Sequence, residues 1–405
     1  MKNLPIFVIL VLLLSVRLFF YFEDEKVYKE SEAVELIHAF NHEPKKSSFG
    51  QYFFVDNIMV SIPSFPVYEY GDQVKIKGIV KVYKNDKGEM LMVSDPEVKK
   101  LDDSASFLAV AKHVRQKIED SVLAAMPVRE GSLLLGILLG VRDKIEKGYY
   151  EDLKNAGVLH VIAASGQNVS IVAALLLLLF ERILKRRLAL VFTVLGVAFY
   201  ALLTGFDPPI VRASIMAVFA FGALAFGRQN YSIHILFLTA FLMIFTNPKL
   251  ITDVSFALSF LSTWGIISLK PILDRVRLLD KVRIVKEDIT TTLSAQVATL
   301  PLIISVFSSY SWVSFFVNTI VLWTVPFIMI FGGIGAILSL ILPILGLPFY
   351  LLTFPFLRFF GFVVAFSSQF SLVSRFEAIP LAFIIGYYLI LASILLKFGK
   401  KEINA

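Results

Sequence analysis

The sequence predicts a polytopic α-helical membrane protein with about ten spans and one small β domain outside the bilayer. Hydrophobic residues make up 57% of the 405 residues and charged residues only 18%, whereas soluble domains carry about 25% charge. From residue 157 onward the apolar runs are nearly continuous, while one stretch nearer the N-terminus alternates polar and apolar residues. This composition excludes an ordinary cytosolic enzyme and a disordered chain.

The first apolar run, Leu4 to Phe22, is long enough to cross about 30 Å of hydrocarbon as a helix. Lys2 precedes it and three acidic residues follow it. Because the run is long and no small-x-small cleavage site follows, we expect an anchor and not a cleaved signal peptide. Residues 1–22 are thus predicted to be an N-terminal transmembrane anchor that enters from the cytoplasm.

Residues 23–103 are predicted to form the β domain. Val74 and Ile76 alternate with polar residues, and turn signals stand at Gly71 and between Asn85 and Gly88, which indicates strands and a hairpin. Further strands are expected at 52–60 and 90–93. A chain segment of this length with several short strands suits a small barrel of the OB-fold type.

The aromatic residues of this β domain leave two interpretations open. The candidates are Tyr52, Phe53, Phe54, Phe65, Tyr68, Tyr70 and Tyr83. They form either the core or a platform on which bases of a single strand stack. The segment from residue 23 to 103 holds 16 acidic and 11 basic residues, and this negative balance favours the core.

Residues 104–156 are predicted to hold amphipathic and re-entrant helices. Within 104–130 apolar residues recur at helical spacing, and Arg115 and Glu119 fall on the polar side, as in a helix that lies on a membrane surface. The apolar run 133–141 is too short to cross a bilayer. We therefore expect it to be re-entrant or interfacial.

The remaining residues, 157–405, are predicted to be the transmembrane domain. Spans are expected at 158–182, 187–204, 209–227, 231–246, 253–269, 289–307, 313–341, 347–368 and 379–397, with 313–341 as one broken helix or two. Basic residues gather in the connections that share one side, namely Lys2, Lys185 to Arg187, Arg228, Lys270 to Lys286, Lys397, Lys400 and Lys401. By the positive-inside rule that side is cytoplasmic, which puts residues 23–103 outside. The positive-inside bias also explains most of the net charge of +7, although a polyanionic cargo would suit it too.

Polar side chains interrupt the apolar runs in three clusters. The candidates for lining a channel or contacting DNA are His160, Ser165, Gln167 and Asn168 in the first cluster, Asp207 and Arg212 in the second, Asp253 and Ser259 in the third, and Gln296 and Asn318 beyond them. Such groups are costly at membrane depth unless they face the bundle interior or a wet cavity. The alternative for the amides and hydroxyls is hydrogen bonding between helices.

Arg212 has two interpretations. It either pairs with Asp207, which is placed to cap the following helix, or acts as a fixed cation that meets a phosphate. The Ser165-Gly166 step is expected to break a helix, since open backbone is tolerated only inside protein or along a cavity.

Signatures of catalysis and metal binding are missing from the sequence. It contains no Walker A loop, no His-Glu-x-x-His and no Gly-x-Ser-x-Gly motif. Ser165 and His160 are poorly spaced for a direct hydrogen bond on a helix. With no cysteine and five scattered histidines, no metal or other cofactor is expected, and the chain is not expected to be an enzyme.

At the three clusters the sequence resembles the ComEC family of bacterial competence proteins. His160 to Asn168 is similar to the family's His-Leu-Leu-Ala-x-Ser-Gly-x-His stretch, Pro209 to Met216 to its Pro-x-x-Arg-Ala-x-x-Met, and Asn247 to Phe260 to its Asn-Pro…Asp-x-x-Phe-Gln-Leu-Ser-Phe. Pro301 and Asn318 follow in family order. Two positions depart from the pattern: Asn168 replaces a frequent histidine and Ala257 a frequent glutamine.

The resemblance implies a multi-pass channel that passes single-stranded DNA across the bacterial cytoplasmic membrane. It also implies an outer DNA receptor and a cytoplasmic helicase-like motor as partners. Longer members carry a metallo-β-lactamase-like domain, whose His-x-His-x-Asp-His motif is absent here, so a separate nuclease is expected. The alternative is a transporter of a small solute, lipid or envelope precursor on the same bundle, in which Arg212 would only pair with Asp207.

Overall fold

The computed structural model describes all residues except 1–3, 24–27, 29, 41–43, 48–49, 56–57, 86–87, 95, 102–106, 163–164, 226–231, 276–285, 371–372, 377–379 and 400–405. The predictions for Lys2, Arg228, the middle of the 270–286 connection and the C-terminal lysines at 400 and 401 lie outside the described residues. The chain divides into two compact units. One is Leu18–Lys117, and the other joins Met1–Arg17 to Ile118–Ala405.

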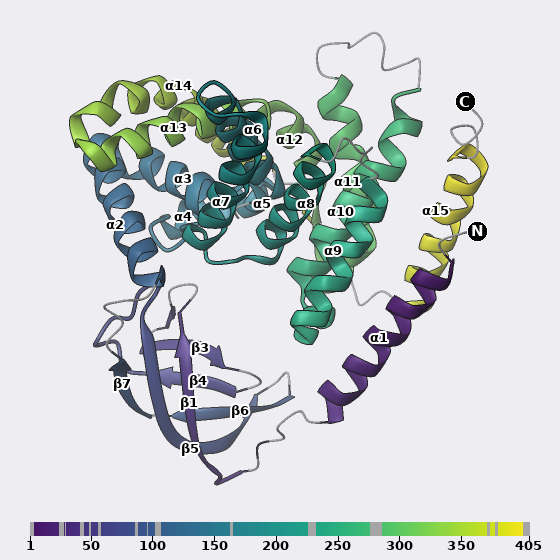
Figure 1. Cartoon of the computed structure of the whole chain (residues 1–405). Coiled ribbons are helices and arrows are strands. Elements are labelled where there is room, and N and C mark those ends of the chain that lie inside the picture. The colour runs from purple at the N-terminus through teal and green to yellow at the C-terminus, as the bar shows by residue number, and fades with distance from the viewer. Residues whose placement is uncertain are drawn as a thin grey trace. The chain divides into compact units, whose positions relative to one another are not determined.

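The first unit is a curled, half-barrel sheet (Figure 1). Its strands are β1 (Ala33–Ala39), β2 (Lys45–Ser47), β3 (Gly50–Val55), β4 (Ile58–Ile62), β5 (Gln73–Asn85), β6 (Gly88–Ser94) and β7 (Glu97–Leu101). The order is β1-β5-β6-β4-β3-β2, and β7 pairs with β5 on its other side. The predicted hairpin is present, with Asn85 opposite Gly88. The expected single strand at 52–60 is instead the antiparallel pair β3 and β4.

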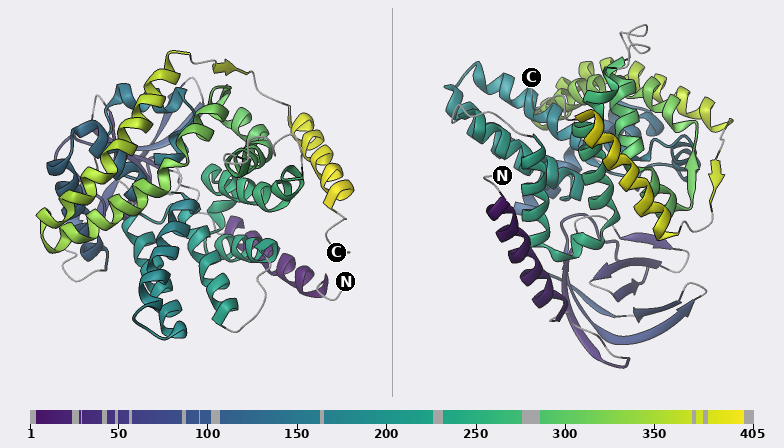
Figure 2. Two further views of the ribbon diagram at one scale, coloured as in Figure 1. Left: turned by 90° about the horizontal axis from the view of Figure 1, so that it is seen from above. Right: turned by 90° about the vertical axis from the view of Figure 1, so that its right-hand side faces the viewer.

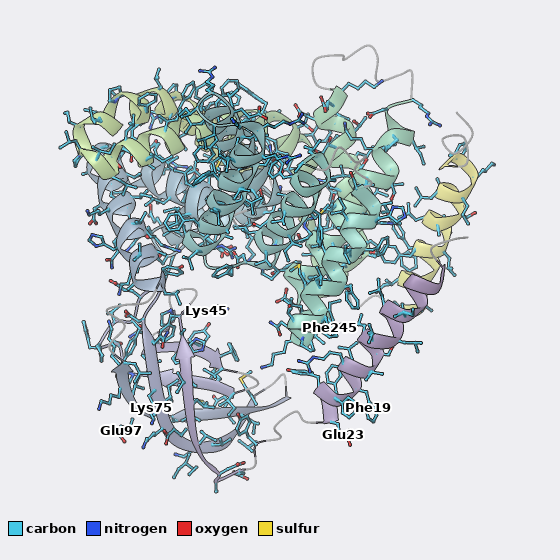
Figure 3. All side chains as sticks on the ribbon, in the orientation of Figure 1. Phe19, Glu23, Lys45, Lys75, Glu97 and Phe245 are labelled. Atoms are coloured by element: carbon cyan, nitrogen blue, oxygen red, sulfur yellow. The ribbon has the colours of Figure 1, made fainter. Side chains whose placement is uncertain are left out.

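Alternation along β5 builds the core of this sheet. Val74, Ile76 and Val80 are fully buried, while Lys75 on the opposite face forms an ion pair with Glu35. Figure 3 shows the Lys75 and Glu97 side chains pointing away from the sheet. The aromatic candidates divide between the two interpretations: Phe53, Tyr68 and Tyr70 are buried, Tyr52 is half-buried, and Phe54, Phe65 and Tyr83 are exposed.

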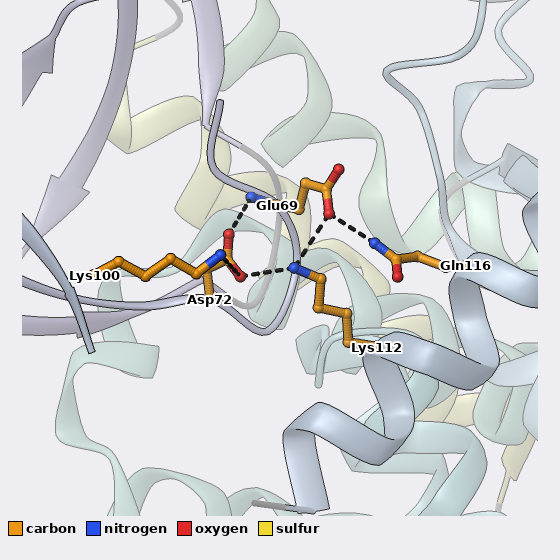
Figure 4. Close-up of polar contacts among 5 residues, drawn as sticks. All are labelled: Glu69, Asp72, Lys100, Lys112 and Gln116. Atoms are coloured by element: carbon orange, nitrogen blue, oxygen red, sulfur yellow. Dashed lines mark hydrogen bonds and ion pairs between the residues drawn. The ribbon is translucent and has the colours of Figure 1, made fainter. Parts of the chain in front are cut away.

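A polar network fixes the start of helix α2 (Phe107–Ala125) against the turn before β5 (Figure 4). Lys112 Nζ lies 2.7 Å from Asp72 Oδ1 and 3.2 Å from Glu69 Oε2, and Lys100 Nζ lies 2.8 Å from Asp72 Oδ1. Gln116 Nε2 donates to Glu69. Burial favours a higher pKa for Asp72, but hydrogen bonds from both lysines and from the Glu69 N–H outweigh it and hold this pKa below its usual value.

Two residues on the predicted polar side of α2 are buried. Arg115 and Glu119 are 5% and 8% exposed. The Arg115 guanidinium lies 4.6 Å from the centre of the Tyr70 ring, a cation–π contact that a buried arginine can use.

The second unit is helical. Its helices are α3 (Val128–Leu139), α4 (Lys147–Asn155), α5 (Leu159–Ile162), α6 (Gly166–Glu181), α7 (Arg186–Leu203), α8 (Pro208–Ala225), α9 (Ser232–Thr246), the short η1 (Pro248–Thr252), α10 (Val254–Leu273), α11 (Lys286–Phe307), α12 (Ser314–Val321), α13 (Thr324–Ile341), α14 (Pro343–Ser368) and α15 (Leu381–Gly399). Helix α1 (Leu4–Glu23) is present where the anchor was predicted. Strands β8 (Ser309–Ser311) and β9 (Val373–Arg375) pair with each other.

Seven described helices are long and apolar enough to cross a membrane, namely α7, α8, α10, α11, α13, α14 and α15. Helices α6 and α9 are apolar but shorter. The single span expected at 158–182 is divided into α5 and α6, and the stretch 313–341 is divided into α12 and α13. Residues Glu130 to Leu139 of α3 are all buried, so this short helix is surrounded by protein and not exposed along one face.

Glycines allow the closest helix contacts. Helices α13 and α14 lie side by side (Figure 2), and a Cβ built on Gly335 would lie 2.9 Å from ring atoms of the fully buried Tyr350. Gly265 of α10 similarly faces the Ser294 carbonyl of α11. Small residues at such positions let apolar helices pack closely without a hydrophobic driving force between them.

Candidate functional site

The helix break predicted at Ser165 and Gly166 is present. Helix α5 ends at Ile162, Ser165 is extended with φ −108° and ψ 166°, and α6 begins at Gly166. The first N–H groups of a helix have no intrahelical acceptor. The N–H groups of Gly166 and Gln167 are therefore free for another acceptor, and none of the described residues provides one.

The polar residues of the first cluster do not share one environment. His160 and Gln167 are exposed, Ser165 is half-buried and Asn168 is 1% exposed. The Ser165 hydroxyl donates to Asn168 Oδ1 at 3.0 Å, and Asn168 Nδ2 donates to the Ile137 carbonyl at 2.8 Å. Asn168 is thus held by hydrogen bonds on both sides of its amide.

Asn168 completes the C-terminus of α3. The last carbonyls of a helix lack N–H donors, and Gly140, with φ 74°, caps α3 through its own N–H to the Gly136 carbonyl. Asn168 supplies the donor for Ile137, and the Tyr200 hydroxyl supplies one for the Leu138 carbonyl at 2.8 Å. Tyr200 was not among the sequence candidates, because a tyrosine in an apolar run gives no signal of its partner.

Asp207 does not pair with Arg212. Its carboxylate lies 3.9 Å from the guanidinium of Arg142, in the loop after α3. Its carbonyl accepts hydrogen bonds from the N–H groups of Ile210 and Val211, so Asp207 is the first capping residue of α8. The pairing expected if Arg212 were only structural is therefore not formed.

Arg212 joins the three clusters. This α8 residue is 8% exposed, and its Nη1 donates to the Ser259 carbonyl of α10 at 2.7 Å. A Cβ at Gly166 would overlap Arg212 Nη2, so the guanidinium lies directly against the start of α6. One residue from each block of the sequence resemblance therefore meets at this guanidinium: Gly166, Arg212 and Ser259.

The residues of the third cluster form hydrogen bonds at the start of α10 and within it. Asp253 caps α10, since its carboxylate accepts from the Phe256 N–H at 2.6 Å. The Ser259 carbonyl also accepts from the hydroxyls of Ser262 and Thr263, each at 3.0 Å. The Ser259 carbonyl therefore accepts from two hydroxyl groups as well as from the Arg212 guanidinium.

Gln296 and Asn318 lie outside this group. Gln296 accepts a long hydrogen bond of 3.4 Å from the Tyr310 hydroxyl. Asn318 is 4% exposed, and its Oδ1 has no donor among the described residues. No described contact joins either amide to Arg212. The described residues also hold no group of three His, Cys, Asp or Glu side chains able to bind a metal ion.

Comparisons with known proteins found one family profile and two similar sequences. The profile of a family described as "Competence protein" matches residues 137–401. "ComE operon protein 3" of Bacillus subtilis (strain 168) is 26% identical over 230 residues, which are 56% of this chain and 29% of that protein. An uncharacterized protein of Aquifex aeolicus (strain VF5) is 36% identical over 108 residues, 26% of this chain and 25% of that protein. The chain thus matches less than a third of the length of either relative, and no solved structure matches it significantly.

Proposed function

The chain belongs to the competence protein family, and from this membership we propose that it is a DNA-uptake protein of the cytoplasmic membrane that passes single-stranded DNA through its helical unit. The observation that carries the proposal is the meeting of three separate sequence blocks at Arg212. A buried cation among apolar helices is costly, and in membrane proteins such residues commonly mark the path of a substrate or an ion. Phosphates of DNA are the anions that such a path would carry.

The β unit has a supporting role in this proposal. We propose that the half-barrel is OB-like, lies outside the membrane with residues 23–103, and receives DNA before the helical unit. Exposed Phe54, Phe65 and Tyr83 support the idea, because aromatic faces stack bases of single strands without sequence preference. The remaining predicted spans, α1, α6 and α9, would bring the total to ten.

Other proteins would complete the process. The proposal makes the chain a conduit and not an enzyme, so an outer DNA receptor, a helicase-like motor and a separate nuclease would act with it. Phosphate binding by lysine and arginine releases counterions, so affinity for single-stranded DNA should fall steeply as salt rises. Equal binding at low and high salt would contradict this electrostatic part.

The decisive test is uptake in a competent strain that lacks its own competence channel. The chain is expressed with the competence proteins of its own genome, membrane insertion is confirmed, and nuclease-resistant labelled DNA is counted in the cytoplasm. Uptake that is lost with Arg212→Ala but kept with Arg187→Ala, an exposed arginine at the start of α7, would support the channel and the role of Arg212. No uptake from the correctly inserted, unsubstituted chain would overturn the proposal.

A further inference from the structure

Two positive groups face each other at the start of α6. The N-terminus of a helix carries roughly half a positive charge, and the Arg212 guanidinium lies against its first residue, Gly166. Arg212 is 92% buried, and its Nε has no partner among the described residues. Its one described hydrogen bond goes to a neutral carbonyl, that of Ser259.

Nearby carboxylates do not neutralise this charge. Asp207 lies beside Arg142, and Asp253 caps its own helix. Within the described part of the chain no ion pair involves Arg212. A buried charge without a partner destabilises a protein strongly, and a cation placed at the positive end of a helix adds repulsion.

We infer that an oxyanion of the phosphate class binds between Arg212 and the first N–H groups of α6. The donors that meet here are the N–H groups of Gly166 and Gln167 and the Arg212 guanidinium, whose Nη2 lies against Gly166 and whose Nε has no partner among the described residues. Together they match the several oxygens of one phosphate. The glycine at 166 lets the backbone and the guanidinium come close together. The bound anion supplies the negative charge that the described protein groups do not.

A phosphate of this kind can come from DNA, from a lipid headgroup or from solution. That it belongs to DNA rests on the proposed function, whereas the anion site itself rests on the geometry alone. The test therefore uses three probes on the full chain, purified in a maltoside detergent that contains no phosphate: a labelled oligo-dT, inorganic phosphate, and phosphatidylglycerol.

The first measurement is the affinity for oligo-dT as salt is varied. Arg212→Gln should weaken binding about tenfold or more, as expected for the loss of a charge-assisted contact. It should also reduce the slope of log affinity against log salt by about 0.7, the value for one phosphate on a single strand. Arg187→Gln makes the same change at an exposed site and should alter both quantities little.

A second variant keeps the charge and moves it. Gly166→Ala displaces the guanidinium from the helix start, because the new methyl group would overlap Nη2. This variant should weaken oligo-dT binding in the same direction as Arg212→Gln. If both variants bind every probe as tightly as the unsubstituted chain, or if Arg187→Gln weakens binding equally, the anion site is overturned.

The probes also separate the sources. Competition by inorganic phosphate or phosphatidylglycerol that disappears in Arg212→Gln assigns the site to that phosphate and supports the anion chemistry. Arg212-dependent phosphate binding in a chain that supports no DNA uptake keeps the site and overturns the proposed function. Conversely, if Arg212→Gln abolishes uptake but binds all three probes as tightly as the unsubstituted chain, the anion site is overturned and the proposed function is kept.

Discussion

Pro301 in the middle of α11 should make the docking of the last helix depend on one hydroxyl group. Proline has no N–H, so the carbonyl four residues earlier, that of Val297, has no intrahelical donor. The Tyr387 hydroxyl of α15 donates to this carbonyl at 2.8 Å. The neighbouring Tyr388 donates to the Ala298 carbonyl at 3.0 Å, which keeps its regular donor at position 302.

The free-energy cost of removing a tyrosine hydroxyl depends on which other hydrogen-bond donors its acceptor carbonyl keeps. Hydrogen bonds between membrane helices average about 0.6 kcal/mol and reach about 1.7 kcal/mol, because lost partners are usually replaced. Val297 has no replacement in its own helix, so Tyr387→Phe should cost about 1–2 kcal/mol, near the cost of a buried unsatisfied acceptor. Pro301→Ala restores an N–H at position 301, and in that background Tyr387→Phe should cost only a few tenths of a kcal/mol.

The assay is reversible unfolding of the purified chain in mixed micelles, with helix content followed by circular dichroism. Four proteins form the double-mutant cycle, and Tyr388→Phe is the control, whose cost should be the same with and without Pro301→Ala. If Tyr387→Phe destabilises both backgrounds equally, the hydroxyl does not compensate for the proline and the reasoning is wrong.

Three further predictions concern packing, capping and pH. Gly335→Ala should cost about 1–3 kcal/mol because its methyl group meets the buried Tyr350 ring, whereas Gly333→Ala on the same helix meets nothing within 4 Å and should be neutral in the same unfolding assay. Asn168→Leu should cost about 1–3 kcal/mol by leaving the Ile137 carbonyl of α3 without a donor; an unchanged unfolding midpoint would contradict this. The pKa of Asp72 is lowered in the folded β unit, so its ionised carboxylate stabilises the unit at pH values above the unfolded-state pKa near 4. This contribution is lost as the pH falls through the folded-state pKa. Asp72→Asn should therefore lower stability at pH 7 and flatten the acid side of a curve of stability against pH.

Local patterns were predictable because their cause lies within a few residues. The turn residues between Asn85 and Gly88 specify the hairpin, Asp253 stands one step before its helix, and the Ser165-Gly166 step interrupts an apolar run. Partners from distant helices were not predictable. Arg115 has the sequence context of a surface residue, yet the Tyr70 ring, far away along the chain, covers it.

The same limit applies to Asp207, whose pairing with Arg212 was one of the two interpretations that the sequence left open. They are five residues apart, but the Asp207 carboxylate lies 3.9 Å from the Arg142 guanidinium, which comes from the loop after α3. Spacing along the chain can show that two groups are close to each other, but it cannot show which distant group one of them contacts. Arg142 reaches Asp207 from the end of α3, a helix that packs beside α5 and against α13 and α14.

The polar residues inside this helical unit fall into two groups, according to whether or not they form hydrogen bonds with unpaired backbone groups at helix ends. Asn168 and Tyr200 supply donors to the end of α3, and Asp253 supplies an acceptor to the start of α10, so backbone needs account for all three. Arg212 serves no such need, because the Ser259 carbonyl that it reaches already lies within a regular helix. Its charge and its Nε remain uncompensated among the described residues. A group whose cost no structural gain offsets is the one where function is to be expected, and in this chain it lies where the three family blocks meet.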